Sequence, residues 1–560
     1  MKYLITSALP YINGIKHLGN LIGSLLPADI YCRYLKQRGH QVVYISGTDE
    51  HGTPAELAAL EKGLPVAEFC ERMYETQRSI YRNFHIDFSY FGRSSSPMNH
   101  SMTQEVFLDL WNNGFIEEQV IPSFYSRVDA RYLPDRYIEG TCPSCGFEKA
   151  RGDQCDSCGS LLDPSELIRP YSVLSGDREL ELRQEKHLFL DLEKLQPELE
   201  NWLRSKTTWS RLVRGIADSW LAEGLKKRCI SRDLNWGVKI PLPGYEHKVF
   251  YVWFDAPLAY IAISKEWAAS SNEDWQTWWK NPETELVQFM AKDNVPFHAV
   301  FWPGMMLGTR AGWQLPSQIK SFSWLNYEKG KFSTSQKRGI FTDEALKLFP
   351  ADYWRYGLTA MAPESTDSDF SFQEFADLIN KDLADKLGNF INRVLTFTIS
   401  KLDGTLTSDC LHTNKDLRSK IQVILSAYDH NMNELKFRAF IGSLRDAWAL
   451  GNEYFTACEP WKVIKHDQRA AAQLLGDCLY LTGLFAVMAF PVIPDSSRKI
   501  WMNLGFTRDI QTLDPSLFTE FWSELHGIQL APKNEILFQK ISPEEVEKLT
   551  HAYRGQPSAS

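Results

Sequence analysis

The stretch MKYLITSALPYINGIKHLGN, residues 1–20, decides the fold class of this chain. Lys2 to Ser7 is a short apolar run typical of a buried strand, and residues 8–16 contain the proline, asparagine and glycine of a loop. From His17 to Gln37 the apolar residues recur at helical spacing, and Gly39 is a stop signal. Gln41 to Gly47 is a second apolar run, rich in Val and Ile. Strand, loop, helix and strand in this order predict the opening of a parallel nucleotide-binding sheet.

Beyond this opening the sequence changes character twice. Near residue 117 it becomes mixed and polar, which indicates an insertion, and sheet-like runs return at Lys248–Trp253 and Glu285–Met290. From about residue 377 it shows repeated 3.6-residue patterns, as in Leu435–Glu453, which predict a helix bundle.

The charge balance excludes a protein that is basic throughout. The 560 residues carry a net charge of −9, so any contact with nucleic acid must use local basic patches. Arg204 to Arg232 holds eight Lys and Arg residues against two acids. A nucleic-acid patch and a solvated helix face both remain open for this segment.

Cysteine usage and the apolar segments point to a cytoplasmic protein. The N-terminus does not resemble a signal peptide, and Leu481–Ile493 is too short to cross a bilayer, so we expect a buried helix there. Six of the ten cysteines are scattered along the chain, which is not the pattern of a secreted disulfide framework.

The other four cysteines form two close pairs. Nine residues separate the pair Cys142 and Cys145 from the pair Cys155 and Cys158, and Gly146 and Gly159 directly follow the pairs. Each C-x2-C turn aims two thiolates at one point, and two such turns complete a tetrahedral zinc site. We expect one structural Zn²⁺; four unrelated reduced thiols are the alternative.

Three loops carry candidate ligand-binding chemistry. His17–Asn20 lies where the first loop meets the first helix, and backbone N–H groups at a helix start favour phosphate. Gly47–Thr53 follows the second strand, so both loops should meet at the carboxyl edge of the sheet. Lys331–Ser335 lies in a Gly- and Lys-rich loop suited to a leaving polyphosphate, although a solvated turn would look similar.

These loops, in chain order, resemble the motifs of one enzyme family. His17–Asn20 resembles the HIGH signature of class I aminoacyl-tRNA synthetases, and Lys331–Ser335 resembles their KMSKS signature. The methionyl-tRNA synthetase versions in particular are similar to ALPY (8–11), GTDEHGT (47–53), YVWFDAP (251–257), KDNVPFH (292–298), DKLGNFINR (385–393) and EPWK (459–462). The match extends from residue 1 to about 500.

The resemblance implies an α/β fold, in which a Rossmann-like parallel-sheet catalytic domain with a zinc-knuckle insertion precedes an all-α anticodon-binding helix bundle. The expected units are the catalytic domain in two halves (1–116 and 230–325), the connective insertion (117–229), a stem-contact region with the KMSKS-like loop (326–376), and the helical anticodon domain with its tail (377–560).

The resemblance also implies a two-step reaction. Methionine and ATP would form methionyl-adenylate and pyrophosphate, and methionine would then pass to the 3′ end of its tRNA. The implied partners are ATP with Mg²⁺, L-methionine and methionine tRNA, without a membrane, and we expect a monomer.

Matched positions carry the implied roles. The catalytic residues would be His17, Asn20 and Lys331. The ATP contacts would be His17, Gly19, Asn20, Asp293, Lys331 and Thr334. The methionine site would comprise Ala8, Leu9, Tyr11, Asp49, Trp253, Pro257, Tyr260 and His298, with Asp49 holding the ammonium group. The anticodon readers would be Asn389, Arg393 and Trp461.

Two positions depart from the family pattern. Asn20 replaces the last histidine of HIGH and carries no charge, and Thr334 replaces the second lysine of KMSKS. The nearest cations that could replace this lysine are Lys337, Arg338 and Lys329.

Three alternatives remain at this point. A synthetase for leucine, isoleucine or valine shares both signatures, but usually carries a large editing insertion. A nucleotidylyltransferase shares the fold but has no need of a helical domain containing Trp461. The two departures also permit a synthetase-derived binding protein that has lost catalysis.

Overall fold

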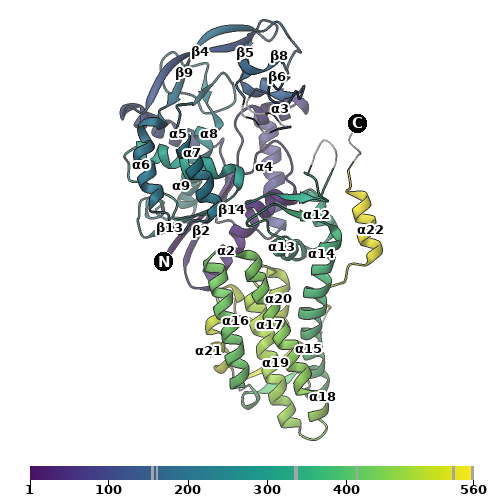
Figure 1. Ribbon diagram of the computed structural model, residues 1–560. Coiled ribbons are helices and arrows are strands. Elements are labelled where there is room, and N and C mark those ends of the chain that lie inside the picture. The colour runs from purple at the N-terminus through teal and green to yellow at the C-terminus, as the bar shows by residue number, and fades with distance from the viewer. Residues whose placement is uncertain are drawn as a thin grey trace.

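The computed structural model describes residues 1–152, 155, 157, 158, 160, 162–332, 338–411, 414–531 and 536–555. Gly159, Thr334 and Lys337, which the sequence singled out, lie outside these residues. In Figure 1 the N-terminal sheet and the insertion form the upper part of the molecule, and the helical domain extends below them.

A five-stranded parallel sheet forms the centre of the N-terminal part. Its order is β14-β13-β1-β2-β3, and each neighbouring pair runs parallel. The strands are β1 (Lys2–Ser7), β2 (Gln41–Thr48), β3 (Tyr90–Arg93), β13 (Thr284–Ala291) and β14 (Gln318–Phe322). The predicted parallel sheet is therefore present, and the loops after β1 and β2 lie at its carboxyl edge.

Helices cover both faces of the sheet, because the βαβ crossovers bury apolar side chains of β1 and β2 on each side. The first crossover continues through three helical segments, α1 (Leu18–Asn20), the π-helix η1 (Leu21–Leu25) and α2 (Leu26–Gln37), and ends before Gly39 as predicted. The remaining helices of this part include α3 (Thr53–Glu61), α4 (Val66–Asn83), α5 (Pro97–Asn112), α9 (Ala259–Ser271), α10 (Gln276–Trp279) and α11 (Trp302–Gly308).

The insertion begins as a long antiparallel ribbon of β4 (Ile116–Ser126) and β9 (Glu181–Leu190). At its far end lies a small sheet of β7 (Ala150–Arg151), β6 (Ile138–Thr141) and β8 (Ile168–Ser172), which carries the cysteine pairs. The chain returns through α6 (Leu192–Arg204) and α7 (Arg211–Ala222).

The prediction of a strand at Lys248–Trp253 is mostly wrong. Only β12 (Val249–Phe250) is extended, and it pairs with β11 (Ser231–Arg232) outside the central sheet. The chain then enters α8 (Val252–Asp255). A short apolar run is compatible with either a strand or a buried helix, and here burial of Val252 and Phe254 is achieved by a helical turn.

The C-terminal part is a helix bundle, as the periodicity predicts. Its connection to the sheet domain includes α12 (Thr342–Leu348), α13 (Ala351–Ala360), α14 (Phe372–Leu378) and the paired strands β15 (Leu325–Tyr327) and β16 (Ser368–Phe370). The bundle contains η7 (Ile379–Gly388), α15 (Asn389–Leu402), α16 (Lys415–Asn433), α17 (Phe437–Cys458), α18 (Pro460–Val463), α19 (Gln468–Ala489), α20 (Pro494–Asn503) and α21 (Phe518–Ser523). The last helix, α22 (Pro543–Ala552), turns back beside α14 (Figure 1).

One helix among the described residues is long and apolar enough to cross a membrane. This is α19, but 89% of its apolar window is buried within the protein, where it packs on α17 and α20. The segment from residue 481 was expected to be a buried helix, and it is the second half of α19 up to Ala489.

The basic segment Arg204–Arg232 uses several of its charges internally. Arg204 lies 3.6 Å from Glu200, Arg214 lies 3.2 Å from Asp218, and Lys227 lies 2.6 Å from a carboxylate of the β4 strand. These ion pairs favour a solvated helix face over a dedicated nucleic-acid patch.

Candidate functional site

The loops after β1 and β2 are joined directly. The Asp49 N–H donates to the Pro10 carbonyl at 2.9 Å, and the Ile12 N–H donates to the Asp49 carbonyl at 2.8 Å. Tyr11 and Asp49 thereby form an isolated parallel bridge. This junction places the Asp49 side chain beside the first loop.

Three buried carboxylates meet at this junction, and two of them have a cationic or imidazole side chain as partner, whereas Asp49 accepts a backbone N–H, that of His51. Glu50 lies 2.9 Å from the guanidinium of Arg93, and Asp255 lies 2.6 Å from His51 Nδ1. Asp49 Oδ1 is buried without a hydrogen-bond partner among the described residues. Burial raises the pKa of Asp49 well above its usual range, and the charges of Asp255 and Glu50 add to this effect. An ammonium group is the ligand that this carboxylate best fits.

A buried polar pair, Tyr260 and His298, lies near Asp49. The Tyr260 hydroxyl lies 3.0 Å from His298 Nε2, and His298 Nδ1 lies 3.0 Å from the Asn294 carbonyl. Because a carbonyl only accepts, Nδ1 carries the proton and Nε2 accepts from Tyr260. Burial lowers the pKa of His298 to about 4, so the ring is neutral at physiological pH. The Leu9 N–H also donates to the Tyr260 hydroxyl.

Three aromatic side chains near Asp49, those of Tyr11, Trp253 and Phe297, contact one another. The Trp253 indole donates to the Tyr11 hydroxyl, and its ring centroid lies 4.3 Å from that of Phe297. Pro257 is buried one helical turn beyond Trp253, and the half-buried Ala8 packs against the same core. The structure places the eight predicted methionine-site residues around these contacts, and their binding roles stay predictions.

The histidine of the first signature loop has a defined proton position. The Gly19 N–H donates to His17 Nδ1 at 3.1 Å, so the neutral ring carries its proton on Nε2. Burial and then the charge of Lys16 lower the pKa of His17 to about 4. His17 therefore presents a neutral N–H donor, as a phosphate oxygen requires. Asn20 Oδ1 accepts the His17 backbone N–H at 3.2 Å, which leaves the Asn20 NH₂ group as a donor.

The chain just after the second signature loop, at residues 340–342, lies against the first loop. The Leu18 N–H donates to the Ile340 carbonyl at 3.3 Å, and the Thr342 N–H donates to the Lys16 carbonyl at 2.9 Å. Lys331 is exposed, and its ammonium lies 5.8 Å from the ring centroid of Trp324.

Trp324 connects Lys331 to Asp293, another of the predicted ATP contacts. Its indole N–H donates to the Asp293 carboxylate, and Lys292 lies 4.1 Å from its ring centroid. At 43% exposure the ring remains accessible. The structure therefore gathers Asp293 and Lys331 around one aromatic side chain.

The base of the second signature loop is anchored by backbone contacts. Arg338 Nη2 donates to the carbonyls of Tyr327 and Glu328 at 3.0 and 2.9 Å, and Nη1 donates to the Arg554 carbonyl at 3.4 Å. The Gly339 N–H donates to the carbonyl of Tyr553 at 3.1 Å. Arg338 therefore holds the loop base and the C-terminal segment, which weakens its candidacy as the replacement cation.

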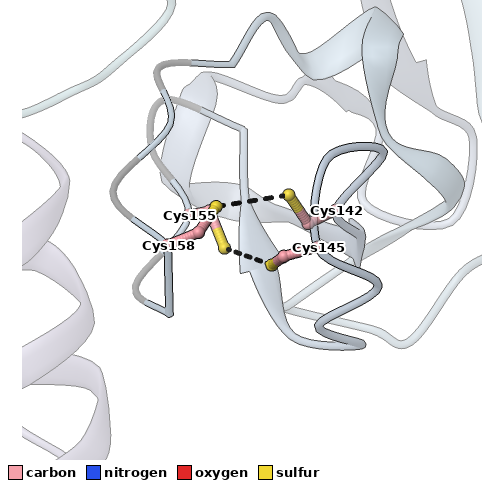
Figure 2. A group of neighbouring side chains, drawn as sticks. All are labelled: Cys142, Cys145, Cys155 and Cys158. Atoms are coloured by element: carbon pink, nitrogen blue, oxygen red, sulfur yellow. Dashed lines mark hydrogen bonds between the residues drawn. The ribbon is translucent and has the colours of Figure 1, made fainter.

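The four paired cysteines converge (Figure 2). Their sulfur atoms all lie within 4.8 Å of one another, with Cys142 and Cys158 3.9 Å apart and Cys145 and Cys155 3.6 Å apart. Tetrahedral zinc with Zn–S bonds of about 2.3 Å requires sulfur separations of about 3.8 Å. Gly146, at φ +76°, donates its N–H to the Cys142 carbonyl at 3.0 Å and forms the tight turn. The cluster fits a four-thiolate metal site.

The predicted anticodon readers lie together in the helical domain. Asn389 and Arg393 are one turn apart on α15, and Asn389 is exposed. The Arg393 guanidinium lies 5.9 Å from the ring centroid of Trp461 and 4.6 Å from that of Phe455. Trp461 is half-buried, so part of its ring remains available for stacking.

Sequence reasoning did not assign a role to several residues of the site. His51 and Asp255 form a buried pair, although both lie inside the quoted motifs. The Trp236 indole donates to the Glu50 carbonyl at 2.6 Å and approaches the His51 ring edgewise. Trp324 lies seven positions before Lys331, and an aromatic residue beside a basic loop was the one signal that could have identified it.

Comparisons with known proteins identify the family of the chain. A family model described as tRNA synthetases class I (M) matches residues 3–395, and one described as the anticodon binding domain of methionyl tRNA ligase matches residues 407–558. Methionine--tRNA ligase 1 of Acaryochloris marina is 49% identical, covering 99% of this chain and all of the relative. Methionine--tRNA ligase of Streptomyces avermitilis is 47% identical with the same coverage.

A solved structure shows the same fold. The Mycobacterium tuberculosis methionyl-tRNA synthetase bound by methionyl-adenylate has a TM-score of 0.75 and 21% identity, covering 96% of this chain and all of that one. This likeness confirms the predicted fold class. Family models match most of the chain, and relatives of full length share nearly half of its sequence. The chain therefore belongs to the methionyl-tRNA synthetases of class I.

Proposed function

We propose that the protein joins methionine to its tRNA, by way of methionyl-adenylate. One observation carries this proposal: Asp49 presents an unpartnered buried carboxylate oxygen close to Tyr11, which contacts Trp253, and to Tyr260, which contacts His298. The carboxylate would bind the α-ammonium, and the aromatic side chains would hold an unbranched, polarizable thioether side chain. The named ligases among its relatives support the same reaction.

In the first step the methionine carboxylate would attack the α-phosphorus of ATP. A carboxyl O–P bond forms, the bond from that phosphorus to the bridging oxygen breaks, and pyrophosphate leaves with the electron pair. His17 Nε2–H and the NH₂ group of Asn20 would donate to phosphate oxygens, and Lys331 would neutralise the pyrophosphate. Gly19 allows close approach of the base, Asp293 would hold the ribose, and Thr334 would donate a hydroxyl. Catalysis then consists of positioning and charge stabilisation, without a protein nucleophile.

Two metals are part of the proposal. Mg²⁺ bound with ATP would supply positive charge to the triphosphate. Zn²⁺ would be held by Cys142, Cys145, Cys155 and Cys158, whose sulfur separations fit a tetrahedral site. Four protein ligands leave no open position, so this metal would be structural.

In the second step the ribose at the 3′ end of the tRNA would attack the carbonyl carbon of methionyl-adenylate, and AMP would leave. Asn389, Arg393 and Trp461 would read the anticodon at the opposite end of the molecule, by edge contacts and stacking. We propose the units 1–116 and 230–325 for catalysis, 117–229 for the insertion, 326–376 for stem contact and 377–560 for the anticodon. We also propose a cytoplasmic monomer, which light scattering can test.

Amino-acid-dependent ATP–pyrophosphate exchange tests the proposal. Purified protein is given ATP, labelled pyrophosphate and each of the twenty amino acids in turn. Exchange with methionine alone supports the proposed function. Exchange with leucine, isoleucine or valine would identify a sister synthetase. Exchange without any amino acid would identify a nucleotidylyltransferase, and no exchange under any condition would identify a protein that has lost catalysis.

A further inference from the structure

The rings of His17 and Phe332 are stacked. Their centroids lie 4.4 Å apart, and their planes differ by 4°. Phe332 follows Lys331 in the second signature loop, whereas His17 begins the first. The contact therefore joins the two signature loops through one pair of side chains.

Two glycines enclose this stack. A Cβ atom at Gly19 would lie 2.9 Å from two atoms of the His17 ring, and one at Gly339 would lie 2.3 Å from Phe332 Cδ1. Gly339 also has φ +87°, a conformation that favours glycine. Any side chain at either position would displace a ring, so this backbone matches the stacked arrangement.

The stack completes the restraints on the imidazole. The Gly19 N–H already holds Nδ1, which determines the tautomer but leaves the ring free to tilt about this hydrogen bond. Phe332 covers one face, and Phe341 approaches edgewise with centroids 6.4 Å apart. With the plane held, the Nε2–H bond keeps one direction before ATP binds.

We propose that Phe332 is a positioning residue for adenylate formation, acting through His17 to align the Nε2–H donor with the phosphate and to hold the two signature loops together. This inference rests on the proposed function and adds a residue to it. A loop with Thr334 in place of a lysine offers one cation fewer to the leaving group. Preorganisation of the remaining donors then contributes a larger share of the rate.

Simple core packing is the competing explanation, because Phe332 is half-buried and its ring lies 5.6 Å from that of Tyr327. Packing alone would make Phe332 matter for stability without a specific dependence on His17. The two explanations therefore differ in whether the effects of changing the two residues are coupled.

The test measures single-turnover adenylate formation for F332A, F332Y, H17A and the double variant H17A/F332A. An aromatic pair contributes about 0.5–1.5 kcal/mol, so F332A should slow this step by roughly twofold to tenfold. F332Y should restore the rate, and F332A should add almost nothing in the H17A background. Methionine affinity and transfer from preformed adenylate to tRNA should stay unchanged. F521A, which truncates a half-buried phenylalanine of the helical domain, is the matched control.

A second readout needs no activity. In protein with ¹³C-labelled histidine, F332A should shift the His17 ring resonances, because the ring current is lost. It should also raise the His17 pKa from about 4 towards the ordinary value, since the ring gains solvent. Unchanged His17 resonances, additive effects in the double variant, or failure of F332Y to rescue would each overturn the inference. Absence of methionine-dependent exchange in the unmodified protein would instead contradict the proposed function, while the resonances would still report on the stack.

Discussion

The guanidinium of Arg355 lies 2.6 Å from the carboxylate of Asp29, and both side chains are fully buried. Asp29 belongs to α2 of the sheet domain, and Arg355 belongs to α13. Arg355 also donates to the carbonyls of Pro491 and Val492, each at 2.8 Å, in the turn after α19. One side chain therefore connects the sheet domain, the α12–α14 segment and the helical domain.

Replacing Arg355 by Met should destabilise the protein strongly. Asp29 keeps its ion pair with Arg33 at 2.9 Å, so the loss falls on the buried carbonyls of Pro491 and Val492, which lose their donor at a cost of about 1–3 kcal/mol each. Arg72→Met removes an exposed arginine that is ion-paired with Glu68, and should cost less than about 1 kcal/mol. Urea unfolding of both variants checks the difference. If both variants unfold at the same urea concentration, Arg355 does not hold the domains together.

Replacing Asp49 by Asn should weaken methionine binding without a comparable change for ATP. Losing the charged partner of an ammonium group costs about 2–4 kcal/mol, or roughly thirtyfold to a thousandfold in affinity. Because burial raises the pKa of Asp49, the wild-type protein should lose methionine affinity as the pH falls through that raised pKa, where the carboxylate becomes protonated. Methionine KM measured against pH checks this. In the Asp49→Asn variant the rise of methionine KM at low pH should be absent. If this rise is unchanged in the variant, another group must cause it.

Local patterns explain why much of this architecture could be predicted. The run Lys2–Ser7 and the helical spacing after His17 each depend on neighbouring residues, so both elements appear where expected. The meeting of the motif residues around Asp49 could also be predicted, because the carboxyl ends of adjacent parallel strands lie at the same edge of a sheet. The prediction of a strand at Lys248–Trp253 failed because an apolar run that short is compatible with both a strand and a helix.

Contacts between distant segments could not be predicted in the same way. The stack of Phe332 on His17, the pair of His51 with Asp255 and the arginine contact to Asp29 each join residues that no local periodicity relates. The sequence identified Arg338 as a candidate to replace the missing lysine, but only the folded backbone supplies the carbonyls that it binds. Tertiary packing decides these partners.

The cysteine cluster should bind one zinc ion per chain. Metal analysis of purified protein should give a ratio of about one, and C142A/C155A should lower it towards zero because two of four ligands are lost. Cys229 and Cys458 lie outside the cluster, so C229A/C458A is the matched control and should retain the metal. Zinc retained in C142A/C155A would place the metal elsewhere.

Trp461→Ala should impair tRNA charging while leaving methionine-dependent exchange intact. Stacking of one base on an aromatic ring contributes about 1–3 kcal/mol, so kcat/KM for tRNA should fall roughly fivefold to 150-fold. Trp275→Ala removes a half-buried tryptophan of the sheet domain and should leave charging unchanged. Equal losses in both assays for Trp461→Ala would indicate damage to the fold rather than loss of an RNA contact.

The most direct test of the account is a rapid-quench time course with labelled methionine, ATP and methionine tRNA. Without tRNA, methionyl-adenylate should accumulate on the enzyme in an amount close to one per active site, together with pyrophosphate. After tRNA is added, the label should move to the 3′ end of the tRNA as AMP appears. Labelled tRNA formed without prior adenylate, or an adenylate formed only with another amino acid, would contradict the account.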